Sequence, residues 1–164
     1  MTEPSFSSKT TNTWVLTTAA DSDGEVYEQR VEYLAGSPFP PAHYHPAQDE
    51  HFEVESGAMV FVVDGEEKRV SAGESIDIPR GTSHKARNES SEESAIVRWE
   101  TRPALRSEEF FAATATLASG PVDGAVLASE YRDVFRLSGP VAVAVPVLAL
   151  LGRLTGRRLP GKDR

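Results

Sequence analysis

Hydrophobic and polar residues alternate in short runs between residues 11 and 103, and turn-forming residues separate the runs. The alternation is clearest at residues 50–55, where Glu50, Phe52 and Val54 share one face and the residues between them share the other. A period of two predicts β-strands. Further strands are expected at residues 13–19, 25–35, 58–63, 66–70 and 95–100. Many short strands with Gly and Pro corners predict a mainly β fold, a single jelly-roll barrel.

The chain after residue 103 changes to helical spacing. Ser107 is a suitable N-cap for a first helix that would stop at Gly120-Pro121. A second helix is expected from about Asp123 to Gly139-Pro140, because apolar residues recur there at helical spacing. These residues are Leu127, Tyr131, Val134 and Leu137. The sequence therefore predicts a helical C-terminal extension at residues 104–164.

The end of this extension allows two interpretations. An apolar run at residues 141–151, interrupted by Pro146, precedes a tail with five basic residues and one acidic residue. The favoured interpretation is a helix docked on the barrel or on a second subunit, with Leu148 and Leu151 covered. The alternative is peripheral contact with an anionic membrane, since the run is too short to span a bilayer.

Composition narrows the functional classes. The chain has 164 residues, of which 39% are hydrophobic, which suits one domain with a real core. Cysteine is absent, so disulfides, thiol catalysis and zinc–cysteine sites are excluded. The net charge of −8 argues against a nucleic-acid partner. Residues 1–10 are polar and predict a flexible N-terminal arm without a signal peptide, so we expect a cytoplasmic protein.

A candidate metal site lies in the middle of the chain. On a strand, His43 and His45 point to the same face and Tyr44 points away. Glu50 is the one carboxylate on an otherwise apolar strand face, and burying an unpaired carboxylate is costly. A metal ion would remove that cost, and His84, on a later strand, is the fourth candidate ligand. Imidazole and carboxylate ligands suit divalent metals.

The spacing of these residues resembles the two motifs of the cupin superfamily. The first is His43-x-His45, four residues, Glu50, six residues and Gly57. The second runs from Gly73 through Pro79-x-Gly81 to His84 and Asn88. One position departs, because the glycine expected six residues before His43 falls one place early, at Gly36. The resemblance covers residues 25–102 and implies a barrel at residues 11–103, in a single-domain bacterial-type cupin that commonly forms homodimers.

The resemblance also implies a range of functions. Four protein ligands leave two positions open on an octahedral Fe, Mn, Ni, Co or Zn ion, enough for water, dioxygen or a small organic substrate. We expect a metal-dependent enzyme, oxygenase-type or related, or else a non-catalytic cupin that binds or senses a metabolite. Phe52, Phe61 and Trp99 either line the ligand cavity or belong to the barrel core. His51, on the polar strand face, is expected to be no ligand.

Overall fold

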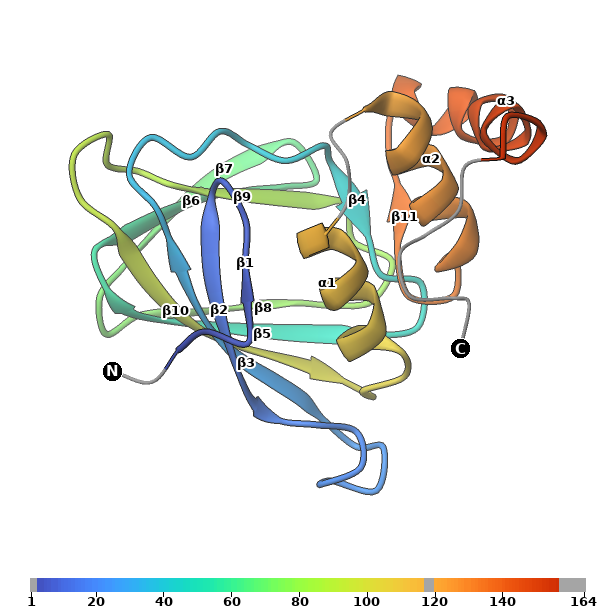
Figure 1. The fold of residues 1–164 in the computed structure, drawn as a ribbon. Helices are drawn as coiled ribbons and strands as arrows, with labels where there is room; N and C mark the ends of the chain where they lie inside the picture. The colour runs from blue at the N-terminus through green and yellow to red at the C-terminus, as the bar shows by residue number, and fades with distance from the viewer. Residues whose placement is uncertain (1–2, 117–119, 157–164) are drawn as a thin grey trace.

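The computed structural model describes residues 3–116 and 120–156, which form a β-barrel of two antiparallel sheets with helices gathered at one end (Figure 1). The six-stranded sheet has the order β1-β2-β3-β10-β5-β8. Its strands are β1 Phe6–Ser7, β2 Thr11–Thr17, β3 Tyr27–Tyr33, β10 Ala95–Arg102, β5 Asp49–Ser56 and β8 Ser75–Ile78. The five-stranded sheet has the order β11-β4-β9-β6-β7. Its strands are β11 Arg136–Leu137, β4 His43–Tyr44, β9 His84–Asn88, β6 Ala58–Val63 and β7 Glu66–Ser71. The expected mainly β barrel is confirmed.

The barrel core follows the alternation of the sequence. In β5, Glu50, Phe52 and Val54 are buried, whereas Glu53 and Glu55 are exposed. Strand β10 pairs with β5 and supplies Val97 to the same core. The other buried members of this cluster are Met59, Phe61, Val70, Ile78 and Ala95. The inward face of β5 therefore carries the one carboxylate that the apolar interior must accommodate.

Two turns show why glycine stands where it does. Asp64 and Gly65 join β6 to β7 with φ of 48° and 88°, the positive pair that a type I′ hairpin needs. Gly57 joins β5 to β6 at φ 75°, and a Cβ built there would lie 3.0 Å from Ala95 Cα. The strand containing the glutamate can turn back into the second sheet only because this position has no side chain.

The N-terminal segment differs from the expected flexible arm. Phe6 and Ser7 pair with Thr13 and Asn12 of β2, so residues 6–7 form a short edge strand. The Ser7 hydroxyl also donates a hydrogen bond to the Asn12 side chain at 2.9 Å.

The extension contains three helices, α1 Ser107–Thr116, α2 Pro121–Glu130 and α3 Pro140–Leu154. The expected second helix to Gly139-Pro140 is wrong, because α2 ends at Glu130 and Arg136–Leu137 pair with Tyr44 and His43 as β11. This pairing provides hydrogen-bond partners for backbone groups of the short strand β4. That gain is larger than the helical tendency of the apolar spacing in residues 131–137. Pro140 begins α3 instead of ending a helix, as its missing N–H allows at the first turn.

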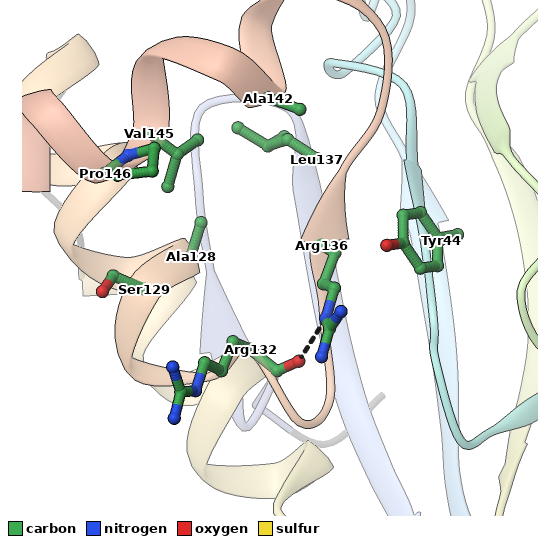
Figure 2. Close-up of a pocket in the computed structure, with 9 residues that line it drawn as sticks. All are labelled: Tyr44, Ala128, Ser129, Arg132, Arg136, Leu137, Ala142, Val145 and Pro146. Carbon is green, nitrogen blue, oxygen red and sulfur yellow. Dashed lines mark hydrogen bonds between the residues drawn. The ribbon is translucent and has the colours of Figure 1, made fainter.

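The helices of the extension pack on one another as well as on the barrel. Phe110, Val126, Leu127, Tyr131 and Val134 form a second buried cluster. Helix α3 lies against α2, and Figure 2 shows Val145 and Pro146 of α3 near Ala128 of α2, beside a pocket of about 350 Å³. The extension is thus packed as expected, but Leu151 is 48% exposed where coverage was expected. None of the helices in the described ranges is long and apolar enough to cross a bilayer.

Candidate metal centre

Three strands bring the four expected ligands together inside the barrel. His43 lies in β4, His45 directly after it, Glu50 in β5 and His84 in β9. His43 and His84 are direct cross-strand partners. One nitrogen of each of the three imidazoles lies within 4.8 Å of the others, a group that could hold a metal ion. Strand alternation points His43, Glu50 and His84 inward, and His45 joins them two residues after His43.

Backbone carbonyls determine which imidazole nitrogen carries the proton. The Nδ1 atoms of His43, His45 and His84 lie 3.0 Å, 2.7 Å and 3.1 Å from the carbonyl oxygens of Pro41, Val134 and Thr82. A carbonyl can only accept, so each Nδ1–H donates and each neutral ring keeps the Nε2 lone pair free. This tautomer is the one that a metal ligand with a backbone-oriented ring adopts.

Glu50 completes the cluster from the six-stranded sheet. Its carboxylate is 3% exposed, with Oε1 at 3.2 Å from His45 Nε2 and Oε2 at 2.9 Å from His84 Nε2. The Trp99 indole N–H donates to Oε1 at 3.0 Å. Neither His45 Nε2 nor Glu50 Oε2 has a partner in hydrogen-bond geometry. Two buried polar atoms without partners are costly, and a divalent cation between them would satisfy both. The donor set fits a metal ion.

The electrostatics favour the protonation state that metal binding needs on three of the four residues: a neutral imidazole on His43 and His45, and an ionised carboxylate on Glu50. Burial, with the neighbouring His84 and His45, lowers the pKa of His43 to about 3. Burial likewise lowers the pKa of His45. Burial alone would raise the pKa of Glu50, but His45 and His84 outweigh it and the pKa falls below its usual value. For His84, burial acts to lower the pKa, but the adjacent Glu50 raises it. A proton on His84 would therefore compete with a metal ion more strongly than a proton on His43 or His45.

An apolar cavity of about 290 Å³ opens beside His43 and His84. Phe52 and Trp99 contribute barrel side chains to its wall. The other aromatic walls come from Phe110, Phe111, Tyr33 and Phe135. The Phe135 ring lies 4.7 Å from the His43 ring, measured between centroids. The helical extension therefore closes the barrel directly over the histidine cluster.

One polar group in this wall has no partner. Gln29 is 1% exposed, and its Nε2 amide donor makes no hydrogen bond. The Tyr27 hydroxyl donates to Gln29 Oε1 at 3.3 Å, which leaves the NH₂ group for the cavity that Gln29 lines. A ligand with an acceptor oxygen would satisfy this donor.

Comparison with known proteins agrees with this geometry. Residues 29–99 match the family model described as the cupin domain. The matched range contains all four residues of the cluster and Trp99. Residues 29–99 form a cupin domain.

Solved structures share the fold of this cupin domain. A predicted oxalate decarboxylase from Thermotoga maritima superposes with a TM-score of 0.56 at 18% identity, over 62% of this chain and 92% of that one. A Klebsiella pneumoniae protein with a double-stranded β-helix domain gives a TM-score of 0.52 at 19% identity, over 60% and 82% of the two chains. At these identities the likeness concerns the fold alone.

A curated relative, the oxidoreductase iacF of Pestalotiopsis fici, is 38% identical over 60 residues. The matched segment spans 36% of this chain and 29% of that protein.

The other residues singled out in the sequence lie partly outside the cluster and partly in the cavity wall. His51 faces outward and lies 2.7 Å from Asp77, away from the cluster, as expected. Tyr44 also points away and lines the pocket on the opposite side of β4 (Figure 2). Phe52 and Trp99 line the cavity, whereas Phe61 is fully buried in the core, 5.2 Å from the Phe52 ring between centroids, and is not part of the wall.

Sequence reasoning did not identify the contributions of the extension to this site. Val134 supplies the carbonyl that orients His45, and Phe110, Phe111 and Phe135 supply cavity walls. Their apolar spacing indicated a packing surface, but no local signal says that this surface faces the histidines. Gln29 carried no sequence signal either, because one glutamine in a strand is unremarkable until its partners are known.

Proposed function

We propose that this cupin domain binds one divalent metal ion through His43, His45, Glu50 and His84 and is a metal-dependent enzyme, oxygenase-type or related, for a small organic molecule. One observation carries the proposal. Three clustered imidazoles have Nδ1–H held by backbone carbonyls, and Nε2 of His45 and of His84 lies within 3.2 Å of the buried Glu50 carboxylate, beside an apolar cavity. The partial match to a protein named as an oxidoreductase supports the reaction class.

The ligand set suits Fe, Mn, Ni, Co or Zn, since it combines imidazoles and a carboxylate and the chain has no thiolate. A bound ion would supply Lewis acidity, and one-electron chemistry if it is redox-active. Trp99 positions the Glu50 carboxylate through its N–H donor. Phe135 and Phe110, whose ring centroids lie 4.9 Å apart, limit access of water from the side of the extension.

The cavity indicates a substrate class. Its aromatic walls suit a flat, largely apolar body, because ring contacts and apolar burial then stabilise the bound state. The unpartnered Gln29 donor adds a preference for a carbonyl or carboxylate oxygen. We therefore propose a small aromatic or enolic compound with an acceptor oxygen as the substrate.

The test compares two histidine variants by elemental analysis and dioxygen uptake. Wild type is expected to hold one metal ion per chain, and His84→Ala to lose most of it because a buried ligand is removed. His51→Ala is the matched control, since this imidazole lies on the outer face, and it should keep its metal. Metal-loaded wild type should consume dioxygen with small aromatic or enolic compounds. Full metal content in His84→Ala would refute the site.

A second candidate is a metabolite-binding cupin in which the metal only anchors a ligand. It is favoured by the cavity wall, where among the described lining residues only His43, His84 and Tyr33 can titrate, and burial raises the pKa of Tyr33 above its usual range. Ligand-induced thermal stabilisation without dioxygen uptake or product formation would select this candidate.

Assembly as a homodimer and location in the cytoplasm remain predictions. Sedimentation velocity of the full chain tests the first, and fractionation of cells that express it tests the second.

A further inference from the structure

Helix α3 buries small residues and exposes large ones. Its two buried residues are Ala149 and Gly152, which lie against the rest of the extension. Val145 and Leu148 are half-buried, but most of its large apolar residues are exposed. Val143, Val147, Leu150 and Leu154 are 81%, 62%, 58% and 74% exposed. A helix at a protein surface normally does the reverse and buries its large apolar side chains.

The exposed residues form one continuous surface. Positions 143, 147, 150 and 154 are spaced by four, three and four residues, which places them in a single row along the helix. Leu151 flanks that row and is also exposed, whereas Val141 in the first turn lies on the opposite side of the helix. Of the eight exposed large hydrophobic residues in the described ranges, six lie on α3, and the others are Leu16 and Leu105. We refer to Val143, Val147, Leu150, Leu151 and Leu154 as the α3 face. A contiguous apolar surface of this kind marks an interaction site.

The charge of the chain indicates what covers the α3 face. Residues 131–164 hold seven Lys and Arg against two Asp, and residues 1–130 hold ten Lys and Arg against twenty-three Asp and Glu. The α3 helix has no acidic residue in its first turn and carries Arg153 in its last. A second copy of α3 would offer no carboxylate to these cations. A surface of anionic phospholipids supplies both an apolar layer and negative charge.

We propose that α3 binds the surface of an anionic phospholipid bilayer, with the α3 face among the upper acyl chains and Arg153 of its last turn at the headgroups. The helix lies in the interface and does not span, in agreement with its fifteen residues. This surface is separate from the metal cluster, so the proposal does not depend on the proposed enzyme activity.

Vesicle sedimentation of the full chain tests the proposal. Wild type is expected to bind vesicles that contain phosphatidylserine at low salt, and to bind pure phosphatidylcholine or high-salt samples much less. Val147→Ser with Leu150→Ser should lower binding at least about tenfold, because two exposed apolar side chains no longer enter the bilayer. Leu16→Ser is the matched control, since Leu16 is 49% exposed on β2, and should bind as wild type does. Arg157→Glu with Arg158→Glu should remove the component of vesicle binding that is sensitive to salt.

A tryptophan reporter shows which face enters the lipid. Val143→Trp should shift its emission to shorter wavelength with phosphatidylserine vesicles, and Leu16→Trp should not. Absence of wild-type binding to these vesicles would overturn the proposal. So would equal binding by the Val147→Ser, Leu150→Ser variant with an unchanged circular dichroism spectrum. A dimer that this variant dissociates, without vesicle binding, would assign the α3 face to a second copy of the chain.

Discussion

The hydrogen bond from Trp99 to Glu50 offers a sharp test of how the metal ligands are positioned. Trp99→Phe removes the indole N–H that lies 3.0 Å from Glu50 Oε1 and keeps an aromatic ring. A hydrogen bond to a buried charged group is worth about 1.5–3 kcal/mol. If most of this free energy orients the carboxylate for the metal, affinity should fall about 10- to 100-fold.

The metal-free protein should also lose stability, because the same hydrogen bond is present without the metal and Glu50 is left with one donor fewer. The remaining ring still contacts Phe52 and Phe111, whose ring centroids lie 4.8 Å and 4.9 Å from that of Trp99, so the protein should stay folded and the free energy of unfolding should fall by about 1–3 kcal/mol. Competition with a chelator measures metal affinity, and urea unfolding measures stability. Trp14→Phe, on β2, is the matched control and should leave metal affinity unchanged. Unchanged affinity in Trp99→Phe, together with normal folding, would refute the role of this hydrogen bond.

Three further predictions concern acid stability, a turn and metal affinity. Hydrogen bonds from Arg80 lower the pKa of Asp49 from 3.8 to about 2, so this carboxylate stabilises the fold above its usual pKa and ceases to do so as pH falls toward 2. Because the pair is half-exposed, Asp49→Asn should cost only ~0.2–1 kcal/mol at neutral pH and nothing near the folded-state pKa, as urea unfolding at both pH values would show. Gly57→Ala should lower the free energy of unfolding by about 2–4 kcal/mol, since it combines positive φ with the close contact to Ala95, while Gly73→Ala, with positive φ and open space, should lose only about 1 kcal/mol. Metal affinity should fall as pH drops through the pKa of His84, which Glu50 holds above its usual value, because the proton then competes with the metal; a pH-independent affinity in chelator competition would count against histidine ligation.

The barrel and the convergence of the four candidate ligands could be predicted from the sequence because both depend on short-range patterns. The alternation in β5 placed Glu50 with Phe52 and Val54, and the structure buries all three. The two-residue spacing of His43 and His45 required only an extended backbone. The face to which each candidate ligand points therefore follows from its position in the local alternation.

The extension could not be predicted to the same depth because its contacts are long-range. Residues 131–137 have helical spacing, yet they form a turn and a two-residue strand because β4 offers unpaired backbone groups. Only this strand brings Val134 to His45 and Phe135 to His43. The outward face of α3 was equally hidden, since apolar spacing does not say whether small or large residues face inward.

The most direct test of the metal site is anomalous X-ray diffraction from crystals of the metal-loaded protein, recorded on both sides of the absorption edge of the metal. The account predicts one anomalous peak per chain, within bonding distance of Nε2 of His43, His45 and His84 and of the Glu50 carboxylate, with each Nδ1 still at its backbone carbonyl. A peak on His51, or metal-loaded crystals with no peak among these four residues, would contradict it.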